Sequence, residues 1–320
     1  MQWCRNPTRS TGRGPVSTDQ VLRAPYLVVD DFLPSDLAAE MRTAAEAHLG
    51  NPYRHTMKTH MDWDYWHVPD LYTYLRTRPA KILGAHLAGL FHERLTEWAA
   101  ETLGHAPTDG YLSLYVNGCR QSQHNDAANG RFGYVYSLTK NERRTTGGET
   151  LIWKEENYFE TRMHRPAWGS AFFQTVEPRF NRLLVFDDRM PHAVQLVEGN
   201  MNPLEGRLVI HGHIREAGPI VSGQLPPDEV RAAAGRLVNE YTSALGDAAG
   251  AYHGPATVSF TVQPDGSVST PSLILDRVRR ETDRGPSVDE MLAGLIARVG
   301  QLKFEPGTQG SRVTVPFGFG

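Results

Sequence analysis

The stretch Gln121-Ser122-Gln123-His124-Asn125-Asp126 contains the residue pair around which we interpret the rest of the chain. His124 and Asp126 are two positions apart, so on an extended segment their side chains point to the same side of the backbone. That arrangement allows both to bind one metal ion, although His-x-Asp alone is a common combination. A third donor, His192, follows at the start of another predicted strand, in Met190-Pro191-His192. The three residues together predict a metal site.

Arg207 completes this set of residues. Arginine is always charged, and its planar guanidinium matches a carboxylate through two parallel hydrogen bonds. Two imidazoles and one carboxylate hold a non-haem Fe(II) ion and leave some of its coordination positions open. An arginine one strand beyond the last ligand is what the binding of a dicarboxylic cosubstrate at such an ion requires.

The composition of the chain excludes several functions. Its 320 residues carry a formal net charge of -3, which gives no electrostatic reason to expect a nucleic-acid partner. No apolar run is long enough to span a bilayer, and residues 1–15 lack the apolar centre of a signal peptide, so we expect no membrane partner and a cytoplasmic location. Cys4 and Cys119 are the only cysteines, so neither a disulfide framework nor a thiolate metal site is expected.

The segment before the metal-binding pair is expected to support the site. Residues 1–22 lack apolar periodicity and predict a flexible leader. An apolar run at 24–30 favours a strand, and residues 37–48 have helical spacing. Residues 52–78 are rich in aromatic side chains and predict a structured loop region, which either contributes a binding surface or only packs an irregular connection. Residues 79–103 predict a second amphipathic helix.

Beyond Gly104 the apolar periodicity changes to two, which is typical of strands. The runs of this kind cover residues 111–117, 133–139, 150–153, 182–186, 192–197 and 207–214. Many short strands without alternating helices imply a barrel or a sandwich. We therefore predict a mainly β fold with some α, in which a jelly roll core is supported by N-terminal helices and occupies residues 23–217.

The C-terminal part is predicted to form a separate unit. Residues 218–255 read as a linker followed by an amphipathic helix. Residues 256–320 predict a small α+β domain, with two strands around the turn Pro264-Asp265-Gly266, a helix near 287–300 and a closing strand at 312–319.

This C-terminal unit carries a resemblance of its own. The run at 258–268, together with 304–306 and 313–317, resembles the C-terminal domain of TonB-type energy transducers, although we do not expect energy transduction from it. An exposed sheet edge in such a unit could bind a peptide or a protein partner by strand addition. The alternative roles are support of the larger domain and contact within a homodimer.

Several short motifs follow one another between residues 25 and 217. They are Tyr115-x-x-Gly118, His124-x-Asp126, Gly130-Arg131, Ser137-Leu138-Thr139-Lys140, Gly147-Gly148-Glu149-Thr150, residues 181–186, Pro191-His192-x-Val194 and Arg207. In this order they resemble the prolyl-hydroxylase branch of the Fe(II)- and 2-oxoglutarate-dependent oxygenases. The resemblance implies a double-stranded β-helix, Fe(II) held by His124, Asp126 and His192, 2-oxoglutarate held by Arg207, and O2 as the second cosubstrate.

The resemblance also assigns residues around the cosubstrate. Tyr115 matches a tyrosine that lies near it, and Val194 is expected to wall the site. Where oxygen-sensing relatives place a tyrosine against the distal carboxylate, this chain has Ser137. A shift of register would bring Tyr134 or Tyr136 to that place instead.

His211 and His213 are unusual for such a site. By strand alternation they share one face with Arg207, at positions where relatives carry uncharged residues. Either they are core histidines satisfied by hydrogen bonds, or His211 orders a water, the substrate or the cosubstrate beside the iron.

The substrate is expected to be a small molecule or a peptide. We predict substrate contacts at Arg131, Trp153, His213, Tyr65 and Trp66. The reaction implied by the resemblance is hydroxylation of an unactivated C–H bond in a peptide, an amino acid or a natural-product intermediate, with formation of succinate and CO2. Desaturation and ring formation remain alternative outcomes. Alternatives from other classes are a noncatalytic sensor of iron or 2-oxoglutarate and an adaptor protein that acts through its C-terminal module.

Overall fold

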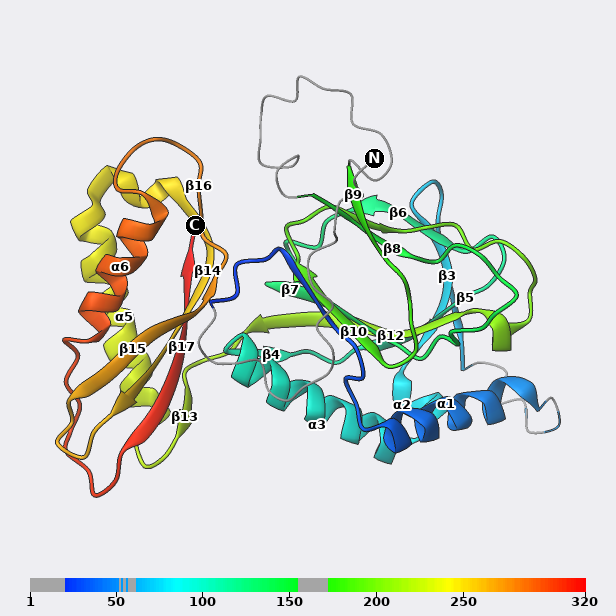
Figure 1. The fold of residues 1–320 in the computed structure, drawn as a ribbon, viewed down its shortest axis with the longest axis horizontal. Helices are drawn as coiled ribbons and strands as arrows, with labels where there is room; N and C mark the ends of the chain where they lie inside the picture. The colour runs from blue at the N-terminus through cyan, green and yellow to red at the C-terminus, as the bar shows by residue number, and fades with distance from the viewer. Residues whose placement is uncertain (1–20, 52, 54–55, 57–61, 155–171) are drawn as a thin grey trace, which may run out of the picture.

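Two β-sheets, each with an apolar core of its own, lie side by side in the computed structural model (Figure 1). The structure describes residues 21–51, 53, 56, 62–154 and 172–320. Most of the predicted leader therefore lies outside the described residues. Its last residue, Leu22, does not belong to a free leader, because its amide N–H donates to Ile274 O over 2.9 Å and its carbonyl accepts from the N–H of Asp276 over 3.0 Å.

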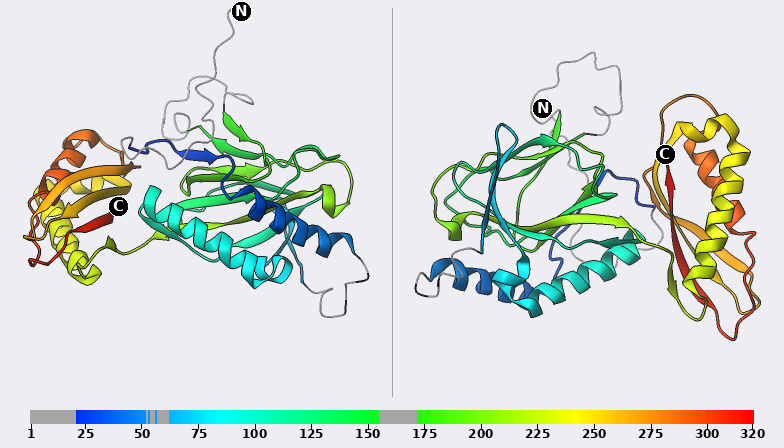
Figure 2. Two further views of the ribbon diagram at one scale, coloured as in Figure 1. Left: turned by 60° about the horizontal axis from the view of Figure 1, so that its bottom comes forward. Right: turned by 180° about the vertical axis from the view of Figure 1, so that it is seen from behind.

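The larger sheet is antiparallel and strongly curled (Figure 2). Its strands follow the order β1-β10-β7-β12-β5-β3-β6-β11-β8-β9, with β2 paired to β3 and β4 paired to β12. They are β1 (Tyr26–Val29), β2 (Asp64–Val68), β3 (Tyr72–Thr77), β4 (His105–Pro107), β5 (Tyr111–Tyr115), β6 (Arg120–His124), β7 (Phe132–Ser137), β8 (Thr150–Trp153), β9 (Phe173–Val176), β10 (Arg182–Asp187), β11 (His192–Val194) and β12 (Arg207–Glu216). The mainly β, jelly-roll-like architecture agrees with the prediction from apolar periodicity.

Three helices cover one face of the larger sheet (Figure 1): α1 (Ser35–Gly50), α2 (Pro79–Leu83) and α3 (Ala85–Thr102). The strand residues that face them are apolar and buried, among them Leu112, Tyr136 and Ile210. Because side chains alternate along a strand, the neighbours of these residues point to the opposite, concave face. The alternation of apolar residues therefore determines which side chains project from the concave face, where a site can form.

Two local predictions before the metal-binding pair are wrong. Residues 62–78 do not form a loop region, since β2 and β3 pair there as an antiparallel hairpin. The helix expected over 79–103 is interrupted at Gly84, whose φ of +84° lies in the left-handed region that only glycine adopts easily. Strands β4, β6 and β9 were not expected, and their short polar sequences explain why.

The smaller sheet has the order β13-β17-β14-β15, with β16 paired to β14. Its elements are β13 (Ile220–Ser222), α5 (Pro227–Leu245), β14 (Tyr252–Val262), β15 (Val268–Asp276), β16 (Arg279–Arg280), α6 (Val288–Val299) and β17 (Ser311–Phe319). Helices α5 and α6 lie on the side of this sheet that faces away from the larger sheet (Figures 1 and 2). Ser287 and Glu290 form a capping box that begins α6.

Residues 218–255 were predicted as a linker followed by an amphipathic helix; the helix is α5, and the rest of the segment is more ordered than the sequence suggested. It contains β13, which pairs with β17, and the first residues of β14. Short strands without strong periodicity are hard to distinguish from linkers, which explains the error. The division of the chain into domains at residues 217 and 255, and the resemblance of 256–319 to TonB-type domains, stay predictions.

A buried cluster of charges joins the two sheets. The side chain of Arg277, 0% exposed, donates from Nε to Asp187 Oδ2 over 3.1 Å and from Nη1 to Arg23 O over 2.8 Å. Arg189 Nη2 donates to Asp187 Oδ2 over 2.6 Å and to the backbone oxygen of Arg277 over 2.7 Å. Burial alone would raise the pKa of Asp187, but Arg189 and Arg277 hold it below its usual range. A neutral contact, from Thr257 Oγ1 to Leu103 O over 2.8 Å, adds to this junction.

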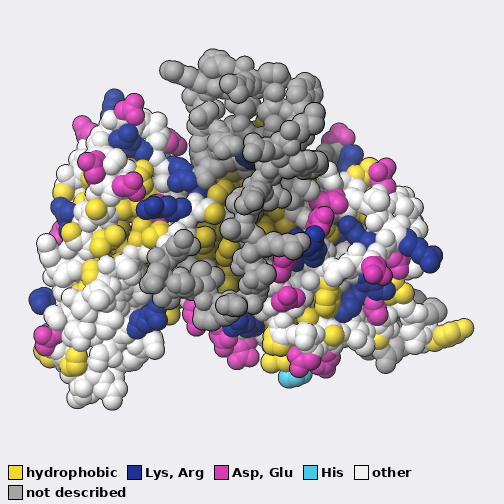
Figure 3. Space-filling model, viewed as in Figure 1, with side chains coloured by type: hydrophobic (Ala, Val, Ile, Leu, Met, Phe, Trp, Pro, Cys, Tyr) yellow, Lys and Arg dark blue, Asp and Glu magenta, His cyan; other side chains and the backbone are white. Residues whose placement is uncertain are grey.

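The surface agrees with the near-balanced charge of the sequence. On the face shown in Figure 3, acidic and basic side chains are interspersed over both sheets. Within the described part of the chain, no helix has both the length and the apolar character needed to cross a membrane.

We predict that Arg277→Met lowers the free energy of unfolding by about 3 kcal/mol, because it leaves Asp187 buried with one cation fewer. The control is Arg231→Ala on α5, whose ion pair with Asp228 is solvent-exposed, and whose loss costs less than about 1 kcal/mol. Urea unfolding followed by circular dichroism measures both changes. Equal stability of the two variants would show that the buried cluster does not hold the sheets together.

Candidate metal centre

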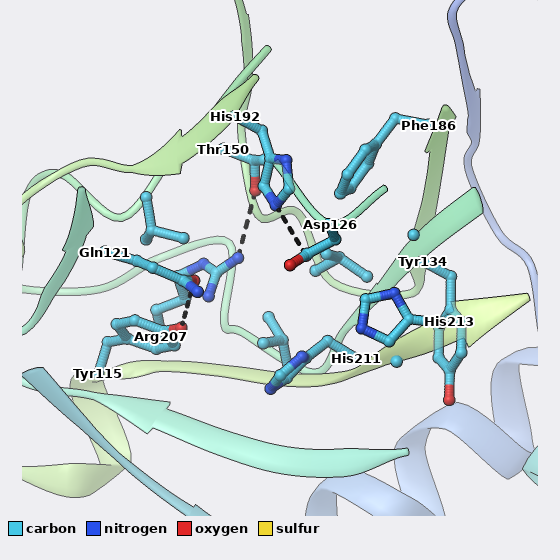
Figure 4. Close-up of a pocket in the computed structure, with 15 residues that line it drawn as sticks. Tyr115, Gln121, Asp126, Tyr134, Thr150, Phe186, His192, Arg207, His211 and His213 are labelled. Carbon is cyan, nitrogen blue, oxygen red and sulfur yellow. Dashed lines mark hydrogen bonds and ion pairs between the residues drawn. The ribbon is translucent and has the colours of Figure 1, made fainter. Parts of the chain in front are cut away.

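His124, Asp126 and His192 come together on the concave face of the larger sheet, and Figure 4 shows Asp126 and His192 of this group. One donor atom from each lies within 4.8 Å of the others. His124 ends β6 and His192 begins β11, and the two residues are direct partners across these antiparallel strands. Asp126 Oδ2 is 3.3 Å from His192 Nε2 and 3.8 Å from His124 Nε2. Strand pairing therefore assembles the three residues that the sequence singled out.

Hydrogen bonds to the backbone orient both imidazole rings. The Nδ1 atom of His124 lies 2.8 Å from Ser122 O, and that of His192 lies 3.1 Å from Met190 O. A carbonyl oxygen only accepts, so each Nδ1 carries the proton and each Nε2 presents its lone pair to the space beside Asp126. Histidines that bind metals are commonly oriented in this way, with the other ring nitrogen donating to a carbonyl or carboxylate oxygen. The donor set therefore fits a divalent ion.

The charge states of these groups also favour a cation. Burial lowers the pKa of His124, which keeps its imidazole neutral. Burial alone would raise the pKa of Asp126, but the two neighbouring imidazoles, His192 more than His124, bring it to about 2. Near neutral pH, Asp126 is therefore a carboxylate and His124 an uncharged imidazole, and these are the forms that bind Fe(II).

Arg207 lies deep in the same pocket and is only 1% exposed. Its Nη2 atom donates to Thr150 Oγ1 over 3.2 Å, and its guanidinium carbon lies 4.7 Å from the centre of the Tyr115 ring. Nε and Nη1 are buried and have no hydrogen-bond partner among the described residues. A buried cation with two unpaired donors is costly unless an anion satisfies it, so the site fits a ligand carboxylate.

The Gly147-Gly148 turn explains why two glycines precede Thr150. A Cβ on Gly147 would lie within 1.8 Å of Leu196 O, and one on Gly148 would lie 3.1 Å from the Cδ atom of Arg207. Both residues have a positive φ, 76° and 78°. The turn therefore lets the chain pass close to the arginine stem and places the Thr150 hydroxyl beside the guanidinium.

The pocket wall contains several of the predicted residues. Tyr115, Val194, His211 and His213 all line it. Others that the sequence analysis did not select line it too: Gln121, Thr150 and Phe186. Phe186 packs its ring 4.5 Å from that of His192, and Gln121 Nε2 lies 3.2 Å from His124 Nε2. Of these three, only Phe186 alternates with a buried core residue, Val185, so only Phe186 has such a signal in the sequence.

His211 and His213 make different contacts. The Nε2 atom of His211 lies 2.8 Å from Ser113 Oγ, and burial lowers the pKa of this imidazole to about 3, so it is neutral. His213 Nδ1 lies 3.0 Å from Oδ2 of the buried Asp188. Burial raises the pKa of Asp188 to about 6, while Asp188 raises the pKa of His213. Both histidines thus have hydrogen-bond partners and also line the pocket, so neither interpretation of them is excluded.

Asp188 ties His213 to the metal-binding cluster. Its backbone oxygen accepts from the N–H of Asp126 over 2.9 Å, and Asp126, Asp188 and His213 form a second group whose donor atoms lie close together. Since the two groups share Asp126, they belong to one site.

Ser137 does not line the pocket, contrary to the prediction. Its Oγ donates to Pro178 O over 3.0 Å and accepts from the N–H of Thr139 over 3.2 Å. The register shift considered as an alternative does not bring in Tyr136 either, because its hydroxyl donates to Asn181 Oδ1 and its ring packs against Phe91. Tyr134 borders the pocket, but its hydroxyl points away from the metal-binding cluster (Figure 4).

Four predicted substrate residues lie outside the pocket. Arg131 pairs with Glu216 over 3.1 Å beside Gly318 of the smaller sheet. Trp153 packs on Phe172, with ring centres 4.9 Å apart. Tyr65 is 67% exposed, and Trp66 lies under the guanidinium of Arg76 at 3.2 Å. The sequence could not place these side chains, because the path of each loop and hairpin relative to the site depends on tertiary packing.

Comparison with known proteins gives one family match, to the family described as the 2OG-Fe(II) oxygenase superfamily, over residues 111–215. No curated protein matches the chain. Among solved structures, a prolyl hydroxylase from Trichoplax adhaerens in complex with a hypoxia inducible factor peptide is 15% identical, with a TM-score of 0.42, over 58% of this chain and 81% of that one.

Two further structures are similar to the same extent. A Pseudomonas putida prolyl-4-hydroxylase is 16% identical, with a TM-score of 0.42, over 60% of this chain and 92% of its own. The α-ketoglutarate-dependent epimerase SnoN from nogalamycin biosynthesis is 18% identical, with a TM-score of 0.39, over 59% and 77%.

The superfamily uses Fe(II) and 2-oxoglutarate with O2, which makes its members oxidoreductases. The donor set of the His-Asp-His cluster fits Fe(II), and the buried, incompletely paired Arg207 fits a carboxylate of 2-oxoglutarate. Over residues 111–215, about a third of its length, this chain matches the 2OG-Fe(II) oxygenase superfamily.

Proposed function

We propose that this protein is an Fe(II)- and 2-oxoglutarate-dependent dioxygenase that hydroxylates an unactivated C–H bond of a peptide, an amino acid or a natural-product intermediate. The observation that carries the proposal is the buried Arg207, which lies on the same concave face as a His-Asp-His cluster and whose Nε and Nη1 lack partners among the described residues. A metal site alone would not require such an arginine. Together they match a dicarboxylic cosubstrate that contacts both.

Each residue has a stated task in this proposal. His124, Asp126 and His192 hold the iron through Nε2, Oδ2 and Nε2. Arg207 binds the distal carboxylate of 2-oxoglutarate, and Thr150 fixes the orientation of the guanidinium. When bound, the iron supplies the oxidative chemistry in which 2-oxoglutarate and O2 give succinate and CO2 and one oxygen atom enters the substrate.

The remaining wall residues shape the space around the reacting groups. Val135, Val194 and Val209 line the pocket with apolar side chains and limit the access of water. Tyr115 Oη donates to Gln121 Oε1 over 3.4 Å, which ties the arginine end of the pocket to the histidine end. His211 is neutral and adds no positive charge that would compete with Arg207 for the cosubstrate.

We predict that His192→Ala weakens the binding of Fe(II) by more than about 100-fold, since loss of an outer partner of a metal ligand already costs about 10- to 100-fold. Calorimetric titration with Fe(II) without O2, or with Co(II) as a stable substitute, measures the affinity. His67→Ala on the exposed face of β2 is the control. If both variants bind the metal as the unmodified protein does, the three residues are not its ligands.

We predict that Arg207→Ala raises the dissociation constant of 2-oxoglutarate by about 100-fold, because one partner of a buried charged pair is removed. Arg215→Ala is the matched control, since Arg215 lies on the same strand but is exposed and donates to Asn129 O. Equilibrium binding of 2-oxoglutarate to the metal-loaded protein gives the result. An unchanged affinity in Arg207→Ala would contradict the assignment.

The catalytic part of the proposal has its own test. We expect succinate to form only when Fe(II), 2-oxoglutarate and O2 are all supplied, and none to form with His192→Ala. A mass-resolved search for singly oxygenated products among peptides and amino acids identifies the substrate class. A protein that binds iron and 2-oxoglutarate but never forms succinate would be a sensor and not a dioxygenase.

A further inference from the structure

A second arginine, Arg76, lies on the same concave face as the candidate metal centre. Arg76 of β3 is the direct strand partner of Ser113 on β5, and Ser113 is the partner of Val209 on β12. Paired residues of neighbouring strands project to the same side of a sheet. Since Val209 lines the pocket, Arg76 extends the pocket face by two strands.

Aromatic rings hold this guanidinium in place. Its carbon atom lies 3.2 Å from the centre of the Trp66 ring and 4.3 Å from that of Tyr111. Contact with two rings fixes the plane of the guanidinium and reduces the conformational freedom that is lost when a ligand binds. The arginine is therefore preorganised for a planar anion.

Arg76 has no acidic partner within the described part of the chain. Nε is buried without a hydrogen-bond partner, and no acidic side chain there forms an ion pair with the guanidinium. Asp64 is its cross-strand partner in the hairpin, yet the guanidinium turns to Trp66 instead. Burial raises the pKa of Tyr74, and the charge of Arg76 and a side-chain hydrogen bond with it partly lower that pKa again. The charge of Arg76 also contributes to the lowered pKa of His211.

Shared ring contacts connect Arg76 to the pocket. The Tyr111 ring lies 6.2 Å from the ring of His211, which lines the pocket. Tyr74, two residues before Arg76, stacks on Tyr115 with ring centres 5.0 Å apart. The guanidinium of Arg207 in turn lies over the Tyr115 ring. The concave face thus presents two guanidinium groups: Arg207 deep in the pocket, and Arg76 partly exposed beyond His211.

We propose that Arg76, held between Trp66 and Tyr111, binds a carboxylate group of the primary substrate and so selects acids over their neutral analogues. This inference rests on the proposed dioxygenase function, in which Arg207 is already assigned to 2-oxoglutarate. Two hydrogen bonds from a planar fork to one carboxylate give both affinity and orientation. The bound acid would then lie across His211, with its reactive carbon directed to the metal-binding cluster.

The test measures binding and does not depend on turnover. The full-length protein is loaded with Fe(II) and saturating 2-oxoglutarate without O2, and is titrated with the free L-amino acids and benzoate, each compared with its primary amide. We expect at least one acid to bind about tenfold or more tightly than its amide. This preference should disappear in Arg76→Gln.

Arg78→Gln is the matched control, because Arg78 lies 4.5 Å from the same Tyr111 ring but is exposed. It should keep the preference for acids. The proposal is overturned if no acid binds better than its amide, or if Arg76→Gln keeps the preference. Should Arg76→Gln not fold, Arg76→Lys replaces it, since it keeps the charge but not the planar fork, and an unchanged preference in Arg76→Lys then overturns the proposal.

Failure of the proposed function is visible separately in these titrations. If 2-oxoglutarate does not bind before any acid is added, the dioxygenase assignment is at fault. If 2-oxoglutarate binds and no acid is preferred, only the role of Arg76 is wrong. A purely structural stack of Arg76 on Trp66 would lower the melting temperature of Arg76→Gln without any difference between acids and amides.

Discussion

The guanidinium of Arg207 is buried in the interior of the curled sheet, where Nη2 donates to Thr150 and neither Nε nor Nη1 has a partner among the described residues. An incompletely satisfied buried charge is unfavourable, so the surrounding structure has to hold it in place. Backbone pairing of β12 with β5 and β7 does this from both sides, and the Gly147-Gly148 turn packs against its stem. The cost of this arrangement is recovered when an anion binds, which links the shape of the fold directly to its ligand.

The metal-binding cluster depends on the same sheet. His124 and His192 face each other because β6 and β11 are paired, and backbone carbonyl groups set their tautomers. The segment after β10 adds a further constraint. Asp187 is bound by Arg277 of the smaller sheet, while the next residue, Asp188, contacts His213 beside Asp126. The C-terminal sheet therefore binds Asp187, the residue next to Asp188 at the candidate centre. This contact favours a role of the C-terminal sheet in supporting the larger sheet.

Much of the fold could be predicted from local sequence. Alternating apolar residues indicated the strands near 111–115, 132–137 and 207–216, and the helix predicted near 287–300 corresponds to α6. Predictions failed where the local signal was weak. The polar strand β6 has no apolar alternation, and the hairpin of β2 and β3 is formed by aromatic residues whose periodicity is poor. Such strands are stabilised by their partners, which a local pattern does not contain.

By itself the sequence determined the chemistry of the candidate centre: two imidazoles, a carboxylate and an arginine. Only the tertiary structure decided which neighbours complete it. Thr150 and Phe186 line the pocket, although the sequence did not indicate them, and Ser137 does not. Strand register and the curl of the sheet determine which side chains converge there. Arg76 is the clearest case. Arginines are common in sequences. That Arg76 lies on the pocket face, with no acidic partner among the described residues, becomes evident only when β3, β5 and β12 are placed side by side.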